Sequence, residues 1–299
     1  RLIKIKNRKK HKLKVPYKLV STMRAGVLTM GTLLGRYQTN KIYVAKGGGC
    51  SLGIRDINYH LEGFQTLGAN NSLNNGYVEI FSTRGLNGSF YKFPKVTVTG
   101  TANLIMASVL AKGIHVLKNI SIEPEIIDLI NFLNNSGANI KFISRRVLKI
   151  TGVNELIKGH HDIIGDRIEA FSYLCVGAIS RGTIIVRNIN PIFLSSELNV
   201  LKKLGCTIKT ENNTISIKSK NSLKPLKITT GPYPKFATDN MPALLAVLST
   251  VKGKSEINET IFSNRFMAAP ELSRMGAIIK IKKNKAIIHG QKKLLGADC

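Results

Sequence analysis

The chain has 299 residues, 43% of them hydrophobic, which is enough for two domains of ordinary size, each with its own core, so a globular protein is expected. Its 45 Lys and Arg against 17 Asp and Glu give a formal charge of +28, which produces a positive surface that attracts anionic ligands. The charge alone does not distinguish nucleic acid, a membrane surface and a phosphorylated metabolite as the ligand. A drift toward A/T-rich codons would explain much of the excess of basic residues equally well.

The chain opens with a basic run, RLIKIKNRKKHKLK, that has eight Lys or Arg in fourteen residues. Basic stretches that bind single-stranded nucleic acid usually contain stacking aromatic residues, and this run contains none, which disfavours nucleic acid as a partner. No apolar stretch follows the run, and no apolar run elsewhere approaches the ~20 residues that a membrane span needs. We therefore expect a cytoplasmic protein with no signal peptide and no membrane partner.

Residues 45–56, AKGGGCSLGIRD, place three glycines before Cys50 and an arginine, Arg55, five residues after it. Consecutive glycines permit positive φ and motion, which suits a lid or a close approach to a ligand. A thiol near Lys46 and Arg55 is placed to have a lowered pKa and to act as acid, base or nucleophile. The alternative is a glycine turn followed by an incidental cysteine.

The other cysteines, Cys175, Cys206 and Cys299, form no CxxC pair and no metal-type grouping with the six histidines. Cys175 and Cys206 lie in apolar patterns, so both are expected to be buried, unreactive thiols. Neither a disulfide framework nor a metal site is expected.

A unit of about seventy residues recurs along the chain. Two series of glycines repeat in phase, at spacings of 69, 68 and 71 residues in the first and of 69 and 71 in the second: Gly68, Gly137, Gly205 and Gly276, and Gly113, Gly182 and Gly253. Each unit predicts an apolar helix that ends at glycine, a strand, an amphipathic helix with a glycine C-cap, and a pair of strands. The fold class is therefore α/β, built by duplication.

The helices of the second series are expected at 101–111, 171–179 and 241–251, and they are apolar on nearly every face. Such helices require burial on all sides, so we expect them in the middle of a domain with sheets around them. At roughly ten residues they are too short to cross a membrane.

Three further stretches break the repeat pattern. Asp239 precedes an apolar helix in TTGPYPKFATDNMP (229–242) and is either an N-cap or a base that faces a ligand. Arg265 follows a strand in IFSNRFMAAPELSRMGA and is either a solvated charge or a phosphate ligand. GDRIEAF (165–171) sets two acids at a helix start, where capping explains them, and the same stretch also suits a crossing between domains.

Taken together and in order, seven stretches from about residue 15 onward resemble the enolpyruvyl transferase family, and within it the UDP-N-acetylglucosamine 1-carboxyvinyltransferases. The most specific are the cysteine loop and the last stretch. The seven are PYKLVSTMRAG (16–26), GGCSLGIRDINYH (48–60), VTVTGTANLIMASVLAKG (96–113), EPEIIDLINFLNNSGA (123–138), GDRIEAFSYLCVGAISRG (165–182), FATDN (236–240) and FSNRFMAAPELSRMGA (262–277).

The resemblance implies two domains, 1–164 and 165–299, of repeated βαβαββ units around buried helices, an inside-out α/β barrel with ligands in the cleft and a cysteine loop that closes over them. Because the family extends beyond both ends of this chain, each domain is expected to be partial. The implied reaction transfers enolpyruvate from phosphoenolpyruvate to the 3-hydroxyl of UDP-N-acetylglucosamine with release of phosphate. This is the first committed step of peptidoglycan synthesis, which serves cell wall biogenesis, cell shape and division, and it needs no cofactor or metal.

The resemblance also implies roles for individual residues. Cys50 matches the general acid of the addition step, which epoxide inhibitors such as fosfomycin alkylate, and Arg55 matches the loop arginine that meets phosphate. Asp239 matches the base that approaches the sugar hydroxyl, and Arg265 an active-site arginine. The implied substrate-binding residues are Arg24, Arg55, Asp56, Ile57, Asn58, Tyr59, Lys95, Val96, Thr97, Val98, Asp239 and Ile261.

The chain departs from the family pattern at Asn58, where the family usually has Asp, and at Ile122, Met241 and Ser263, where Arg, Gln and an acid are expected. These departures leave two alternatives open, a degraded, non-catalytic relative that binds the UDP-sugar and a basic nucleic-acid-binding protein. The shikimate-pathway enolpyruvyl transferase shares the repeat but lacks the cysteine loop.

Overall fold

The computed structural model describes residues 3–5, 12–20, 22–45, 57–219, 222–291 and 293–298. The strands are β1 (Lys14–Val15), β2 (Ile42–Ala45), β3 (Asn70–Asn74), β4 (Tyr77–Phe81), β5 (Ser89–Lys92), β6 (Ile114–Lys118), β7 (Asn139–Ser144), β8 (Val147–Thr151), β9 (Thr183–Arg187), β10 (Thr207–Glu211), β11 (Thr214–Lys218), β12 (Lys227–Thr229), β13 (Gly253–Asn258), β14 (Ile278–Lys282) and β15 (Lys285–Gly290).

The helices lie between single strands or groups of two or three strands along the chain. They are α1 (Tyr17–Val20), α2 (Thr29–Arg36), α3 (Asn58–Thr66), α4 (Val98–Ser108), α5 (Pro124–Asn135), α6 (Arg167–Ile179), α7 (Ser195–Leu204), α8 (Met241–Ser249) and α9 (Ala268–Arg274), with the 3₁₀ turns η1 (Arg24–Leu28), η2 (Pro191–Leu194), η3 (Thr238–Asn240) and η4 (Arg265–Met267).

One strand order recurs in three of the sheets: β1-β2-β4-β3, β5-β6-β8-β7 and β12-β13-β15-β14. In each, the first two strands are parallel and the remaining pairs are antiparallel. The sheet β10-β11-β9 has the antiparallel part alone, since residues 152–166, between β8 and α6, form no strand. The predicted seventy-residue βαβαββ unit is therefore confirmed.

The amphipathic helices end as the sequence predicts. Gly205 caps α7 with φ 110°, and its N–H donates to the carbonyls of Leu201 and Lys202. The equivalent glycines at 68, 137 and 276 also have positive φ, between 91° and 96°. The apolar helices of the second series do not end at their glycines, because α4, α6 and α8 are capped by Val109, Ser180 and Thr250. Gly113 and Gly253 still have positive φ a few residues later, whereas at the turn after α6 Arg181, not Gly182, takes the left-handed conformation, with φ 56°.

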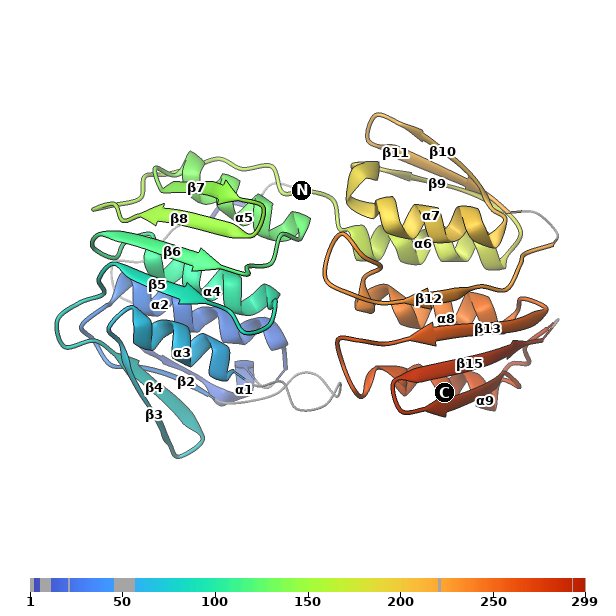
Figure 1. Ribbon diagram of the computed structural model, residues 1–299, viewed down its shortest axis with the longest axis horizontal. Helices are drawn as coiled ribbons and strands as arrows, with labels where there is room; N and C mark the ends of the chain where they lie inside the picture. Colours follow the sequence, from blue (N-terminus) through green and yellow to red (C-terminus); the bar gives the residue numbers. More distant parts are fainter. Residues whose placement is uncertain are drawn as a thin grey trace. The chain divides into compact units, whose positions relative to one another are not determined.

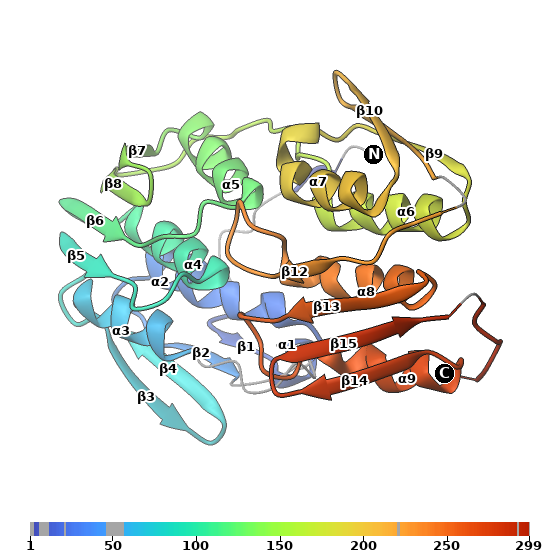
Figure 2. The ribbon, with the colours of Figure 1, turned by 45° about the vertical axis from the view of Figure 1, so that its right-hand side comes forward.

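The apolar helices lie against the sheets. Figure 1 and Figure 2 both show the sheet β12-β13-β15-β14 with α8 and α9 on one of its faces. Most side chains of α4 and α8 are buried, as predicted. The prediction is wrong for one face of α6, where Tyr173 is 55% and Val176 is 50% exposed, because α6 packs on β9, β11 and α8 with its opposite side.

The described residues fall into two compact units. The first comprises those up to Ile122 together with 129–161, and the second comprises 123–128 together with those from Asp162 onward. Cys175 and Cys206 are free thiols buried in the core of the second unit, where burial raises the pKa of both. Their predicted burial is confirmed.

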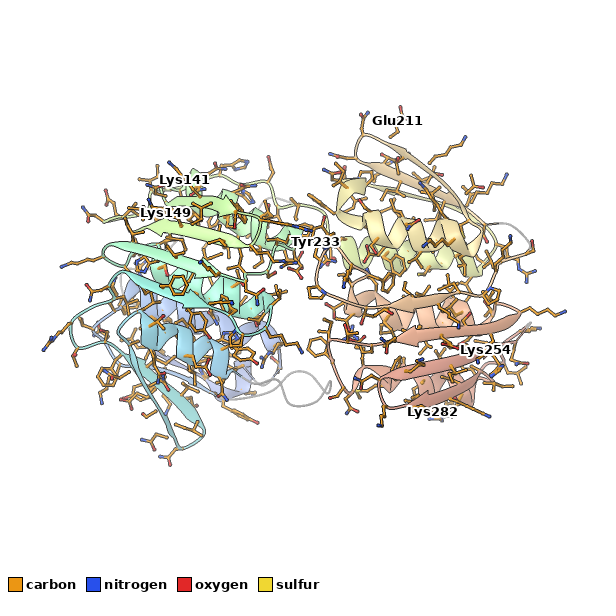
Figure 3. All side chains as sticks on the ribbon, in the orientation of Figure 1. Lys141, Lys149, Glu211, Tyr233, Lys254 and Lys282 are labelled. Atoms are coloured by element: carbon orange, nitrogen blue, oxygen red, sulfur yellow. The ribbon has the colours of Figure 1, made fainter. Side chains whose placement is uncertain are left out.

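Lysines occupy the sheet faces that point away from the helices. Lys141 and Lys149 are direct partners on β7 and β8, and Lys254 and Lys282 lie on β13 and β14 (Figure 3). All four are exposed, so this part of the charge excess lies in contact with solvent. Within the described ranges, no helix has the length and apolar character that crossing a membrane requires.

His115 makes the stability of the first unit depend on pH. Its side chain on β6 is fully buried, and burial lowers its pKa below the usual 6.5. The unfolded chain takes up a proton below about pH 6.5 while the folded chain does not, so the stabilisation is present above that pH and is lost as the pH falls. We expect the melting temperature to fall more between about pH 7.5 and pH 5.5 in the unmodified chain than in His115→Gln, as measured by calorimetry.

The exposed His289 provides the control, because His289→Gln should retain the full pH dependence of the unmodified chain. Equal pH slopes for His115→Gln and the unmodified chain would contradict the assignment.

Candidate active site

The predicted site residues follow the ends of parallel strands. Because two parallel strands point the same way, the segments that follow them start at one edge of the sheet. The segments after β1 and β2 contain Arg24 and residues 46–56, the segment after β5 contains Lys95 to Val98, and those after β12 and β13 contain Asp239, Ile261 and Arg265. Cys50, Arg55 and Asp56 lie outside the described residues, so their roles stay predictions.

In the first unit, three of these segments begin helical structure. Arg24 is half-buried at the start of η1, and exposed Asn58 and half-buried Tyr59 open α3 directly after the buried Ile57. Thr97 is the N-cap of α4, and its Oγ1 accepts a hydrogen bond from Gly100 N at 3.3 Å. Thr97 therefore has a capping function whether or not it also contacts a ligand.

A buried polar network connects those three segments. Asn103 Nδ2 donates to the Val27 carbonyl of η1 at 3.0 Å and lies 2.7 Å from His60 Nδ1 on α3. The other ring nitrogen of His60 lies 3.4 Å from Thr99 Oγ1, in the first turn of α4. Asn103 and His60 are fully or almost fully buried, so they fix the helix starts that carry the predicted sugar-nucleotide residues.

The same network sets the approach of α2 to α4. Gly31 N donates to Asn103 Oδ1 at 2.9 Å, and a Cβ at position 31 would overlap the backbone of Asn103. Glycine is therefore required where the two helices touch. Neither Asn103 nor His60 was predicted, because an Asn in an apolar helix gives no local signal of its partners.

In the second unit, the structure brings Asp239 and Arg265 together. Arg265 Nη2 donates to Asp239 Oδ1 at 2.8 Å, and Arg265 Nε donates to the Thr238 carbonyl at 3.0 Å. The Arg265 side chain is 8% exposed and that of Asp239 is 54% exposed. Arg265 is thus not a solvated surface charge, and Asp239 lies in η3 bound to Arg265 instead of capping α8.

Two buried carboxylates hold the turn that carries Asp239. Glu197, from the first turn of α7, accepts hydrogen bonds on Oε1 from Ala237 N at 2.9 Å and from Asn240 Nδ2 at 3.2 Å. Glu259, which follows β13, accepts one on Oε2 from Thr238 Oγ1 at 2.9 Å. Sequence reasoning missed both, although an acid directly after a buried strand is a signal that could have pointed to Glu259.

Arg167 binds the segment 123–128 to the rest of the second unit. Its Nε and Nη2 donate to the two oxygens of Glu125 at 3.2 and 3.0 Å, and its guanidinium lies 5.8 Å from the ring centre of Tyr233, which Figure 3 labels. Burial alone would lower the pKa of Arg167, but the Glu125 carboxylate raises it. Asp166 caps α6 through Ile168 N and Glu169 N, as predicted for this stretch.

The described residues provide no group of three or more His, Cys, Asp or Glu side chains that could hold a metal ion. In the second unit the predicted residues Asp239 and Arg265 form an ion pair, and in the first unit Asn103 and His60 connect the segments that carry the predicted residues.

The sequence is similar to known transferases. It matches the family profile of EPSP synthase (3-phosphoshikimate 1-carboxyvinyltransferase) over residues 3–299. Curated UDP-N-acetylglucosamine 1-carboxyvinyltransferases from Pelagibacter ubique, Idiomarina loihiensis and Bartonella tribocorum are 43%, 41% and 42% identical over 98%, 95% and 95% of the chain. The matched region covers 70%, 68% and 66% of those proteins.

The structure resembles solved enolpyruvyl transferases. The enzyme NikO from Streptomyces tendae matches 93% of this chain, and 66% of its own, with a TM-score of 0.80 at 17% identity. EPSP synthase from Acinetobacter baumannii matches 89% of this chain and 64% of its own with a TM-score of 0.66 at 19% identity. The predicted enolpyruvyl transferase fold is confirmed, and the chain spans about two thirds of the length of these proteins.

Asn103 offers a test of the buried network. We expect Asn103→Leu to lower the free energy of unfolding by about 3 kcal/mol, because Gly31 N and the Val27 carbonyl lose their partner inside the protein. Urea unfolding measures the loss. The exposed Asn87, whose Nδ2 donates to Gly85 O, provides the matched control, and Asn87→Ala should change stability by less than about 0.5 kcal/mol. Similar losses for both variants would show that the network does not hold the helices.

Proposed function

Since the chain belongs to the UDP-N-acetylglucosamine 1-carboxyvinyltransferases of the EPSP synthase family, we propose that it transfers enolpyruvate from phosphoenolpyruvate to the 3-hydroxyl of UDP-N-acetylglucosamine and releases phosphate. The observation that carries the proposal is the Asp239–Arg265 pair, placed where the parallel strands β12 and β13 end. The pair supplies a base, Asp239, and a cation, Arg265, that are joined by a hydrogen bond.

The proposed reaction has two steps. The sugar oxygen bonds to C2 of phosphoenolpyruvate while Asp239 removes the hydroxyl proton and Cys50 delivers a proton to the methylene carbon. The methyl carbon then loses a proton, the double bond re-forms, and the C–O bond to phosphate breaks as phosphate leaves. Of the Asp239 oxygens, Oδ1 is bound to Arg265 and Oδ2 has no hydrogen bond among the described residues, so Oδ2 is the acceptor.

The binding roles follow from the same placement. Arg265 and Arg55 hold phosphate groups, for which planar guanidinium donors are suited. Arg24, the start of α3 and Lys95 to Val98 bind the sugar nucleotide, held at a fixed spacing by Asn103 and His60. Both substrates are anionic, so a chain with a formal charge of +28 attracts them.

We extend the proposal to the biological setting. The chain works in the cytoplasm in the first committed step of peptidoglycan synthesis, and through it in cell wall biogenesis, cell shape and division. Fosfomycin alkylates it at Cys50. The relatives offer no support for a non-catalytic binder or for a nucleic-acid-binding protein.

Turnover provides the first test. Phosphate release from phosphoenolpyruvate should require UDP-N-acetylglucosamine, and Cys50→Ser and Asp239→Asn should each reduce kcat by at least about a hundredfold because a proton-transfer group is lost. The exposed Asp298 provides a control, since Asp298→Asn should keep full activity. Phosphate release with shikimate 3-phosphate in place of the sugar nucleotide would overturn the assignment.

Binding provides a separate test, because it does not depend on every catalytic group. Titration calorimetry of the folded chain should give heat with UDP-N-acetylglucosamine and none with shikimate 3-phosphate. A silent titration of folded protein would count against any sugar-nucleotide binder. A nucleic-acid-binding protein would instead retain oligonucleotides at physiological salt and release them as the salt concentration rises.

A further inference from the structure

Glu259 is a buried carboxylate that the proposed reaction does not use. It directly follows β13, is 1% exposed, and is fixed at its backbone by donation from its N–H to the Asn284 carbonyl at 2.7 Å. Its neighbour Thr260 donates from N to Thr230 Oγ1 at 3.0 Å and from Oγ1 to the Thr230 carbonyl at 2.8 Å. The carboxylate therefore stands on the rigid end of a parallel strand pair.

The two oxygens of Glu259 bind two different segments. Oε1 accepts hydrogen bonds from Ile261 N at 2.7 Å and from Phe262 N at 3.1 Å, which orders the backbone directly after the strand. Oε2 accepts the bond from Thr238 Oγ1 at 2.9 Å, in the turn that carries Asp239. One side chain thus links the backbone at Ile261 to the position of Asp239.

Arg265 completes the connection from the other side. Its Nε donates to the carbonyl of the same Thr238 whose hydroxyl binds Glu259, and its Nη2 donates to Asp239. Thr238 is therefore held at both its side chain and its backbone. Movement of Thr238 would displace Asp239, the next residue, from Arg265.

We propose that Glu259 is a positioning residue that sets Asp239 and the Ile261 backbone at a fixed spacing, so that the sugar is bound and deprotonated in one geometry. The inference rests on the proposed function, in which Asp239 takes the proton of the sugar hydroxyl, and on the family resemblance, which implies that Ile261 contacts the sugar. Glu259 touches neither substrate and acts through its hydrogen bonds. A displacement of about 1 Å at a reacting group can reduce the rate a hundredfold.

The chemistry of the position calls for two acceptors. A leucine would remove the acceptor of two part-buried N–H groups and of the Thr238 hydroxyl, each at a cost in free energy. A glutamine keeps Oε1 as the acceptor for Ile261 N and Phe262 N, and its Nε2 can donate to Thr238 Oγ1. Glu259→Gln is therefore the conservative variant that should restore both connections.

The kinetic test separates the two connections. Thr238→Val breaks the bond on Oε2 and leaves Oε1 in place, so kcat should fall about ten- to a hundredfold while KM for UDP-N-acetylglucosamine stays within about twofold. Glu259→Leu breaks both, so kcat should fall and KM should rise, each by about tenfold or more. Glu259→Gln should lie within about threefold of the unmodified chain in both constants.

The matched control is Thr250→Val, at the other end of α8. Thr250 Oγ1 donates to the Val247 carbonyl at 2.8 Å, so this variant loses a hydrogen bond of the same kind away from the site. Its kcat and KM should be unchanged at a temperature where every variant is folded. Should Glu259→Leu fail to fold, Thr238→Val against Thr250→Val still decides the question.

Amide hydrogen exchange tests the two hydrogen bonds that Glu259 Oε1 accepts from Ile261 N and Phe262 N, and it needs no substrate. Ile261 N and Phe262 N should exchange slowly in the unmodified chain, Glu259→Gln and Thr238→Val, and much faster in Glu259→Leu. Unchanged exchange in Glu259→Leu, or unchanged kcat in Thr238→Val, overturns the inference while the proposed function stands. Absence of turnover by the unmodified chain overturns the proposed function and, with it, the positioning role.

Discussion

The parallel pairing of the first two strands in each seventy-residue repeat is the constraint on which the rest of this structure depends. Two parallel strands need a crossover connection between them. In the complete repeats this connection is helical: α4 connects β5 to β6, and α8 connects β12 to β13. Each of these two helices packs against the sheet on one side and against other helices around it, α2 and α3 for α4, and α6 and α9 for α8, which explains why α4 and α8 are apolar on almost every face. The pairing also makes both strands end at one edge, so segments about thirty residues apart in sequence meet there.

A meeting of two loops inside a protein leaves backbone groups that need partners, and side chains with several acceptors or donors supply them. In the first unit this is Asn103, which bonds to η1, α2 and α3. In the second unit Glu197 and Glu259 serve the turn before α8. A buried polar group whose bonds are all made favours one arrangement over its neighbours, so the side chains that satisfy the fold also determine where the predicted site residues lie.

The sequence predicts the repeat well because its signal is local. A helix that must turn back into a strand favours a residue with positive φ, and glycines at 68, 137, 205 and 276 mark that position in every unit. This prediction fails at Gly182, because Arg181 takes the left-handed conformation instead. The predicted burial of α6 fails on one face, because burial depends on which elements pack against the helix and the local sequence does not show that.

Asp239 and Arg265 are singled out by their loops, and Glu259 could have been by its place directly after β13, whereas Asn103 and Glu197 could not, because their partners come from elements distant in sequence. The domain boundary at 164 and the catalytic and binding roles of all the predicted site residues stay predictions, and Cys50, Arg55 and Asp56 also lie outside the described residues.

The burial of the Asp239–Arg265 pair is unequal, and the inequality bears on the proposed catalysis. Arg265 is 8% exposed and donates to a backbone carbonyl as well as to Asp239, so its guanidinium plane is fixed before any ligand arrives. The Asp239 side chain is 54% exposed, and its Oδ2 makes no hydrogen bond among the described residues, so it is free to accept one from a hydroxyl. A donor held in place by the fold spends no free energy on reorientation as charge develops, which is the condition for electrostatic stabilisation of a transition state. In the proposed reaction, a surface arginine that is free to rotate could also bind phosphate, but it would have to be reoriented as charge develops.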